Sequence, residues 1–385
     1  MKVGAKRLAI AAAAAAVALT MAGCSSQSAS PKPSGTLSGT IMIPVVHELT
    51  GAAGFAGVAS KNGLDLAVDE LNSSHYLGSG VTIKLDYEDS ASVTDTSVSD
   101  TSAALSSNSP LVIGPLVSTA AQAVSPLAAK FKKAMVYTQA LGPGIAVNDY
   151  VYRLTPDVES YESLVYSYAK EQKVKSVAVL YASDSTRQTY DGTTMTKDFT
   201  SKNNIKILSA DGFPATVTDL TAVSSKIAQE KPDAVIFFMS GTQHVTAVQQ
   251  LRRAGYEGIF LADQGLSSGL AQAGTAADGA VWAAAFSPQS TAPSSVAFVK
   301  AYTAKYDASP AVYAADSYDA MYFIARALKA AGSTDKTAVQ AALQAEVKKS
   351  FEGAQGTITF KGNDAQGSGV LSQYKDGKVT IIKQG

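Results

Sequence analysis

The chain of 385 residues contains one cysteine and three histidines. A single cysteine cannot form an intrachain disulfide, so the fold must be held together by its core. His47, His75 and His244 lie far apart in the sequence, and their number and spacing argue against a histidine metal site. The sequence also lacks a Walker motif and a G-x-S-x-G nucleophile elbow. We therefore expect no cofactor, no metal and no catalytic residue.

The one cysteine, Cys24, follows a segment with the features of an export signal. Three basic residues within the first seven positions precede an apolar stretch, Leu8–Met21, of about 14 residues. A membrane-spanning helix needs about 20. The sequence Met21-Ala22-Gly23-Cys24 resembles the lipobox of bacterial lipoproteins, in which the signal peptide is cut before the cysteine and the new N-terminus is acylated. The resemblance implies a signal peptide at 1–23 and lipidation of Cys24; the alternative is an ordinary signal peptide.

The charge and hydropathy of the rest of the chain argue against several partners. Removal of residues 1–23 leaves 29 basic against 32 acidic residues, a net charge of −3. This balance argues against nucleic acid and anionic membrane surfaces as targets. No second apolar run of about 20 residues follows Cys24, so the membrane would be reached through the lipid alone. The remaining length is sufficient for two domains of ordinary size.

A polar tether precedes two series of alternating strands and helices. Residues 24–38 are rich in Ser, Pro and Gly, which is typical of a flexible linker. In the first series we expect strands at 41–46, 81–87, 111–113 and 134–138, and helices at 57–71 and 119–132. In the second we expect strands at 176–181, 205–213 and 234–239, and helices at 193–202, 219–229 and 245–254. This alternation predicts two doubly wound α/β domains with parallel sheets covered on both faces.

Two loops that follow strands are candidates for ligand contact. Gly51–Gly57 has Ala53 where a dinucleotide fingerprint needs its second glycine, so its glycines indicate close approach of the backbone instead. The second loop, Gly114–Gln122, opens a helix, and Thr119 and Gln122 have the spacing of a capping box. A helix N-terminus presents free N–H groups and the positive end of a dipole. With the hydroxyls of Ser118 and Thr119, this segment would fit a carboxylate; the alternative is capping alone.

Four motifs occur in a fixed order along about 330 residues after Cys24. They are Leu49-Thr50-Gly51 with NGLDLAVDELN at 62–72, Ile113-Gly114-Pro115 with Ser118, YDAMYFIARAL at 318–328 and GTITFKGND at 356–364. Each motif alone is weak. Their order and spacing make the chain resemble the type I periplasmic substrate-binding proteins of ABC importers, of the leucine/isoleucine/valine-binding type.

The resemblance implies two α/β lobes joined by three crossovers, which close on a small ligand. The crossovers would fall near Arg153–Asp157, Ala284–Pro288 and Gly362–Gly369. The first lobe would then comprise 39–155 and 287–362, and the second 156–286 and 363–385. The ligand would lie between the lobes at the carboxyl ends of strands. The implied partners are a small solute and an ABC permease, and the protein would be a monomer.

The resemblance also carries expectations for single residues. Ser118, with Thr119 beside it, stands where the family serine binds the α-carboxylate of the ligand. Ala140 falls in the stretch whose backbone contacts the ligand, although the neighbouring position, usually Thr or Ser, is Leu141. Tyr190 matches the aromatic residue of the second lobe, and the aromatic position of the first lobe falls near Phe55.

One position departs from the family in charge. The acidic residue that pairs with the ligand ammonium in the family falls at Gln264, and a neutral amide cannot supply that pairing. Two alternatives follow. Either the adjacent Asp263 has taken over, or the ligand lacks an ammonium; we expect the second.

These observations predict an extracytoplasmic, lipid-anchored solute-binding protein that performs no reaction, at the cell surface or in the periplasm. The expected ligand is a small carboxylate, either an apolar amino acid or an organic acid. Gln264 and Leu141 also favour a neutral amide or a sugar-like solute. A receptor subunit that senses a ligand without importing it is a further alternative.

Overall fold

The computed structural model describes residues 37–156, 158–239 and 241–384. The predicted signal peptide, Cys24 and residues 24–36 of the predicted tether lie outside these ranges. Within them, no helix combines the length and the apolar character that crossing a membrane requires.

The first lobe is built on a sheet with the strand order β11-β12-β13-β5-β4-β3-β1-β2. Its strands are β1 (Gly39–His47), β2 (Val81–Asp89), β3 (Leu111–Ile113), β4 (Ala134–Tyr137), β5 (Val151–Arg153), β11 (Phe351–Gly353), β12 (Gly356–Lys361) and β13 (Asp364–Gln366). Along the part of the sheet ordered β13-β5-β4-β3-β1-β2, all neighbouring strands are parallel. Strand β12 runs antiparallel to both β13 and β11.

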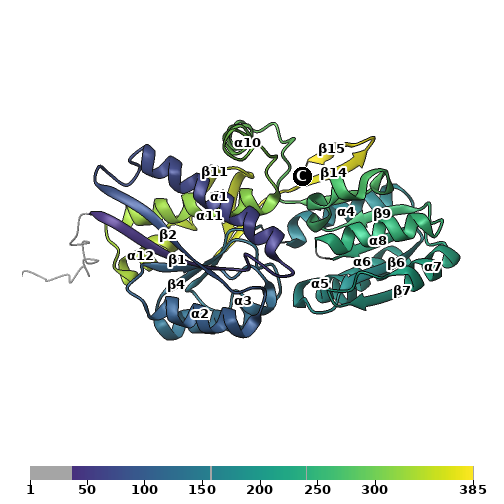
Figure 1. Cartoon of the computed structure of the whole chain (residues 1–385), viewed down its shortest axis with the longest axis horizontal. Helices are drawn as coiled ribbons and strands as arrows, with labels where there is room; N and C mark the ends of the chain where they lie inside the picture. Colours follow the sequence, from purple (N-terminus) through teal and green to yellow (C-terminus); the bar gives the residue numbers. More distant parts are fainter. Residues whose placement is uncertain (1–36, 157, 240, 385) are drawn as a thin grey trace, which may run out of the picture. The chain divides into compact units, whose positions relative to one another are not determined.

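Helices cover both faces of the first sheet. They are α1 (Gly54–Ser73), α2 (Thr94–Ser106), α3 (Ser118–Phe131), α11 (Val312–Ala331) and α12 (Lys336–Glu346), with α10 (Pro293–Tyr306) packed beside α1. Helices α1 and α11 lie together on one face, and α2 and α3 lie on the other (Figure 1). Alternation along β1 explains this arrangement, because Ile43 joins the core under α1 and α11 while Val46 joins the core under α3.

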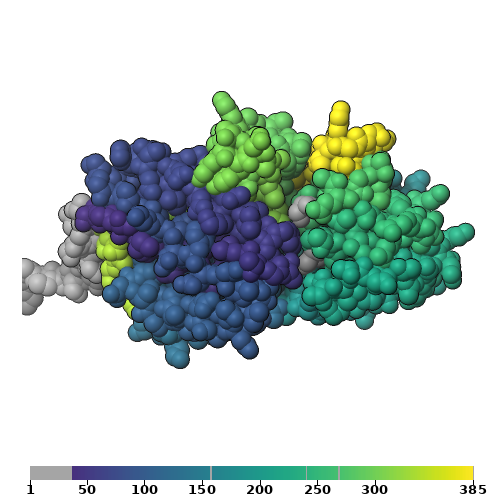
Figure 2. Space-filling view, in the orientation of Figure 1, coloured from purple at the N-terminus to yellow at the C-terminus, as the bar shows by residue number. Residues whose placement is uncertain are grey.

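The second lobe is built on a sheet with the strand order β15-β14-β10-β9-β8-β6-β7. Its strands are β6 (Ser176–Ala182), β7 (Lys206–Phe213), β8 (Ala234–Phe238), β9 (Ile259–Ala262), β10 (Val281–Ala284), β14 (Val370–Lys375) and β15 (Lys378–Gln384). Along the part of the sheet ordered β10-β9-β8-β6-β7, all neighbouring strands are parallel. Strand β14 pairs antiparallel with β10 on one side and with β15 on the other. β15, at the edge of this sheet, has exposed residues along its length and reaches the surface (Figure 2, yellow).

Helices also cover both faces of the second sheet. They are α4 (Val158–Glu171), α5 (Thr186–Tyr190), a π-helical turn (Asp191–Met195), α6 (Thr196–Asn203), α7 (Thr221–Glu230), α8 (Thr242–Arg253), α9 (Leu270–Ala273) and two 3₁₀ turns (Gln264–Ser268 and Gly274–Ala277). Along β6, Val177 and Val179 pack with α4 on one face, whereas Ala178 and Leu180 pack with α7 and α8 on the other.

The predicted fold class, two doubly wound α/β lobes with three crossovers, is confirmed. The chain changes sheet between β5 and β6, between β10 and β11, and between β13 and β14. Strand β13 belongs to the first sheet because Asp364 pairs with Arg153, so the last change falls after Gln366 rather than at 362/363. The exact division into domains otherwise stays a prediction.

Candidate functional site

A cavity of about 390 Å³ lies where strands of both sheets end. Its walls come from loops and helix starts that follow the carboxyl ends of β1 to β4 and β6 to β9, the position at which open α/β sheets bind ligands. The residues that line it are Ala52, Ala53, Phe55, Ala56, Ser92, Thr94, Leu116, Val117, Ser118, Thr119, Gln139, Leu141, Tyr161, Glu162, Asp184, Ser185, Arg187, Gln188, Asp191, Ala215, Met239, Asp263, Gln264, Gly265 and Tyr313.

Helix α3 brings its N-terminus to this cavity. The helix begins at Ser118, after Val117, so the first N–H groups have no partner within the helix. The Ser118 hydroxyl accepts a hydrogen bond from the Gly142 N–H at 2.9 Å, which leaves its own hydrogen to donate. The expected capping box is wrong, because Val117 precedes the helix without a side-chain cap and Gln122 donates to the Pro143 carbonyl instead.

A buried carboxyl group lies behind this helix start. Glu48 follows β1, is 1% exposed, and accepts a hydrogen bond from the Leu116 N–H at 2.9 Å. Burial raises the pKa of Glu48, and the N–H groups of Leu116 and Val117 oppose that shift. The sequence analysis did not identify Glu48, since a single acidic residue after a strand carries no distinctive signal.

The second lobe contributes a buried ion cluster. Arg187 on α5 donates from Nη2 to Glu162 Oε1 on α4 at 2.7 Å and from Nε to Asp191 Oδ2, at the start of the π-helical turn. Burial raises the pKa of Glu162 well above its usual range, against the opposing effect of Arg187. Burial likewise raises the pKa of Asp191 to about 6. One guanidinium therefore serves two carboxyl groups in the cavity wall.

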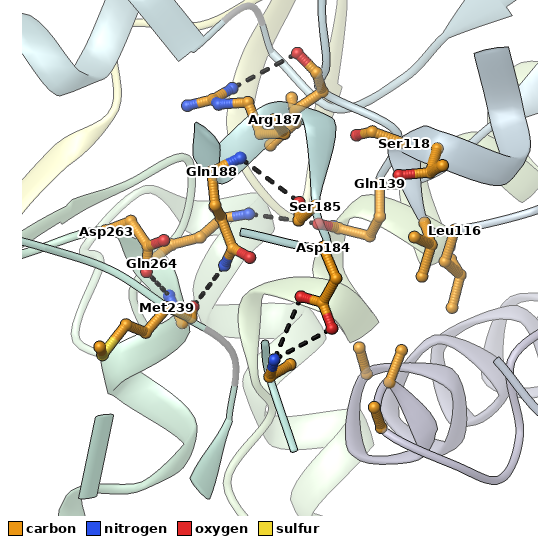
Figure 3. Close-up of a pocket in the computed structure, with 18 of the residues that line it drawn as sticks. Leu116, Ser118, Gln139, Asp184, Ser185, Arg187, Gln188, Met239, Asp263 and Gln264 are labelled. Carbon is orange, nitrogen blue, oxygen red and sulfur yellow. Dashed lines mark hydrogen bonds between the residues drawn. The ribbon is translucent and has the colours of Figure 1, made fainter. Parts of the chain in front are cut away.

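A chain of amide contacts connects the two lobes at the cavity (Figure 3). Gln139, after β4, donates to Asp316 on α11 and accepts from Gln264 Nε2 at 3.2 Å. The Tyr161 hydroxyl donates to Gln264 Oε1 at 3.3 Å. Burial raises the pKa of Asp316 well above its usual range. Both ends of the Gln264 amide are thus bound by the protein itself.

Asp263 lies beside this chain, directly after β9. Its Oδ1 accepts a hydrogen bond from the Gly265 N–H at 2.8 Å and lies 3.1 Å from His244 Nε2. Both residues are buried, and Asp263 lines the cavity whereas His244 lies on α8 behind it. In the part of the chain that the structure describes, His, Cys, Asp and Glu side chains form no group of three that could hold a metal ion.

The structure brings most of the predicted ligand-binding residues to one cavity. Its lining includes Ser118, Thr119, Phe55, Asp263 and Gln264, and the Phe55 ring lies 5.6 Å from that of Tyr313. Their roles toward a ligand stay predictions.

Two predicted residues lie elsewhere. Ala140 is fully buried and does not line the cavity, whereas its neighbours Gln139 and Leu141 do. Tyr190 lines a separate cavity of about 100 Å³ next to Arg187. The position expected for the second-lobe aromatic residue therefore does not face the large cavity, and Arg187 and Gln188, from the same helix, do.

Sequence reasoning missed the cluster of Glu162, Arg187 and Asp191. Arg187 and Asp191 are four residues apart, a spacing typical of a pair on a solvent-exposed helix. Nothing in their local sequence shows that α4 buries this pair. A usable signal was the position of the segment just after strand β6, where ligand-binding loops of parallel sheets occur.

Comparisons with known proteins agree with this geometry. A model of the periplasmic binding protein family matches residues 40–375. Among curated proteins, none matches the sequence.

Solved structures with the same fold include proteins with different ligands. A branched-chain amino acid transporter substrate-binding protein of Streptococcus pneumoniae, in complex with isoleucine, is 24% identical, with a TM-score of 0.80 over 90% of this chain and 100% of that one. A solute-binding protein of R. palustris, in complex with benzoate, is 19% identical, with a TM-score of 0.82 over 90% and 96%. A leucine-binding protein of Thermotoga maritima is 22% identical, with a TM-score of 0.79 over 89% and 98%.

Proposed function

Because the chain belongs to the periplasmic binding protein family, we propose that it captures a small solute bearing a carboxylate and delivers it to the permease of an ABC importer. The solute is an apolar amino acid or an organic acid. A solute that touches both lobes stabilises the closed arrangement, which the permease then recognises. The protein performs no reaction and acts as a lipid-anchored monomer outside the cytoplasm.

The observation that carries this proposal is the start of α3 in the cavity wall. The unpaired N–H groups of the first turn, the helix dipole and the Ser118 hydroxyl together form a donor set for an anion. A carboxylate that accepts from these donors would leave its apolar part near Phe55, Leu116 and Tyr313. The site is tested by a thermal-shift screen of amino acids, organic acids, amides and sugars, because a ligand that binds the folded state raises the melting temperature.

A second candidate is a neutral amide or sugar-like solute. The amides of Gln139 and Gln264 lie in the cavity wall and could exchange their mutual hydrogen bond for bonds to such a solute. The same screen separates the candidates, since only neutral compounds would then raise the melting temperature. A sensor without import would bind in the same way, and its gene neighbourhood would contain a signalling partner rather than a permease.

Replacement of Ser118 by alanine is expected to weaken binding of the carboxylate solute about 10- to 100-fold. A hydrogen bond to a charged group contributes about 1.5–3 kcal/mol, and that contribution is lost. Calorimetry with the best carboxylate from the screen measures the change. Ser125→Ala is the matched control on the same helix, because Ser125 bonds Ala121 and Tyr137 and does not line the cavity. Unchanged affinity in Ser118→Ala would rule out the carboxylate site.

The Cys24→Ser variant is expected to lose its lipid and to appear unprocessed or in the soluble fraction. The thiol is the acyl acceptor in the proposed anchor, and serine cannot replace it in the lipobox. Incorporation of labelled palmitate, followed by fractionation, measures the change, and Ser25→Ala serves as the control that keeps the cysteine. Equal label in Cys24→Ser and in the unmodified protein would refute the anchor.

A further inference from the structure

The charges that line the cavity do not balance. Among the described lining residues, the carboxyl groups are those of Glu162, Asp184, Asp191 and Asp263, and the one guanidinium is that of Arg187. Asp184 is exposed, and its carboxylate is engaged by the Ala215 N–H at 3.0–3.1 Å. The other three carboxyl groups are buried. Asp263 lies 3.1 Å from His244 Nε2, whereas Glu162 and Asp191 share the one guanidinium in a poorly solvated wall.

Arg187 supplies a single positive charge for both Glu162 and Asp191. Each of its three nitrogens already donates to the protein: Nε to Asp191, Nη2 to Glu162, and Nη1 to the Leu141 carbonyl at 3.4 Å. Even so, Glu162 Oε2 and Asp191 Oδ1 are buried without a hydrogen-bond partner among the described residues. The two residues are 3% and 1% exposed. Buried carboxylate oxygens without a donor are costly, so these two atoms indicate a missing donor at the cavity wall.

The proton equilibria of the cluster are consistent with this shortage. Burial, with Asp191 and Asp263 as further causes, raises the pKa of Glu162 well above its usual range although Arg187 is bound to it. Burial, with Asp263 and Glu159 as further causes, raises the pKa of Asp191 to about 6. Each group therefore holds its proton to a higher pH than an exposed carboxyl group does.

Position 264 is unsuited to the same task. The Gln264 amide donates to Gln139 and accepts from Tyr161, so its oxygen has a protein donor. In contrast, the cluster on α4 and at the end of α5 keeps acceptor atoms without partners.

We propose that Glu162 and Asp191, with Asp263 beside them, form a seat for a positively charged group of the solute, an ammonium or a guanidinium. The inference rests on the proposed function, because the same solute places its carboxylate at Ser118. It differs from our expectation from the sequence that the ligand lacks such a group, and it assigns the charge pairing to α4 and the π-helical turn rather than to residue 264. The solute therefore carries both charges, and Glu162 and Asp191 select for the positive one.

Two pairs of probes test the seat, each differing in one charged group. They are 4-(aminomethyl)benzoate against 4-methylbenzoate, and leucine against 4-methylpentanoate. In calorimetry at pH 7.5, the member with the ammonium group is expected to bind about 10-fold or more tighter than its partner in at least one pair. This ratio is expected to fall below about 3 in Glu162→Gln and in Asp191→Asn, which retain hydrogen-bonding groups of similar size but lose the charge.

The controls are chosen to match the chemistry. The control variants are Glu171→Gln, on the same helix α4 as Glu162, and Asp198→Asn, on α6. Both carboxyl groups are exposed, so both variants should keep the affinity ratio of the unmodified protein. Gln264→Ala should also keep it, whatever its effect on affinity. If one cluster variant fails to fold, as judged by its thermal melt, the other variant tests the assignment, and the ratio in the unmodified protein tests whether the cavity prefers a positively charged group.

The outcomes separate the two proposals. Equal or tighter binding of the member without the ammonium group in both pairs would overturn the cation seat and leave carboxylate capture intact. A preference for the member with the ammonium group that survives in both Glu162→Gln and Asp191→Asn would place the seat elsewhere. It would overturn the assignment of the seat to these two residues. If no member of either pair binds, carboxylate capture itself fails and the seat fails with it.

Discussion

Replacement of Arg187 by methionine is expected to lower the free energy of unfolding by about 3–5 kcal/mol at pH 7.5. The loss follows from leaving Glu162 and Asp191 in the interior without their guanidinium, which is far more costly than losing an exposed ion pair. Both carboxyl groups are nearly inaccessible, so water cannot replace the lost partner. Urea unfolding followed by circular dichroism measures the change.

The loss should shrink as the pH falls to 5. The folded-state pKa values of Glu162 and Asp191 are already above those of exposed carboxyl groups, and removal of Arg187 raises them further. A folded state with raised carboxyl pKa values binds more protons than the unfolded state, so its stability increases as the pH falls toward the unfolded pKa values. The window is set by Asp191, whose pKa is about 6, and by Glu162, whose pKa burial raises well above its usual range, with Asp263 and Glu159 as neighbouring charges.

Arg326→Met provides a matched comparison. Its partner Glu346 keeps Lys349 at 2.6 Å, and Arg326 is 30% exposed, so the expected loss is about 1 kcal/mol or less. A loss of similar size in both variants, or an Arg187→Met loss that is equal at pH 7.5 and pH 5, would show that the cluster is not an uncompensated buried charge.

The second large effect is expected at Gly63, where helices α1 and α11 touch. A Cβ atom at this position would lie 2.1 Å from the Ala314 carbonyl oxygen and 2.8 Å from its carbon. Alanine normally stabilises a helix interior relative to glycine by about 0.5–1 kcal/mol. Here we expect Gly63→Ala to destabilise by about 3 kcal/mol, near the upper end for overpacking, because the obstructing atoms belong to the backbone.

The Gly63→Ala substitution should also alter the cavity. Ala314 follows Tyr313, which lines the cavity, and precedes Asp316, which holds Gln139. Displacement of α11 is therefore expected to weaken solute binding in addition to lowering the melting temperature. Gly54→Ala is the control on the same helix, since its Cβ would meet the Leu49 oxygen at 3.1 Å, a close contact but a much longer one than the 2.1 Å at Gly63. If Gly63→Ala is as stable as Gly54→Ala, the close approach of α1 and α11 is not required.

Strands β1 to β4 of the first sheet and β6 to β8 of the second could be predicted, because parallel strands buried on both faces appear as short apolar runs. Val177-Ala178-Val179-Leu180 and Leu111-Val112-Ile113 are such runs, and both are strands. The helical segment from Thr186 was predicted to begin only at 193. Asp191 and Gly192 are poor formers of a helix interior, and here they form a π-helical turn that joins α5 to α6.

The candidate site was predictable where local geometry decides it. Ser118 follows a buried strand and opens a helix, and these two features suffice to place it at the carboxyl end of the sheet. The burial of Glu162, Arg187 and Asp191 depends on the packing of α4 against the end of α5, which separate segments of the chain determine together. The amide pair of Gln139 and Gln264 similarly depends on residues 125 positions apart.

The place of β13 in the first sheet has a consequence for the synthesis of the chain. β13 lies between β5 and β12, so β11 and β12 can join the sheet only through a strand that ends at Gln366. By then the parallel strands of the second sheet, β6 to β10, have all been made. During synthesis from the N-terminus, β5 therefore remains an unpaired edge of the first sheet until β13 is made. Unpaired strand edges invite pairing with other chains.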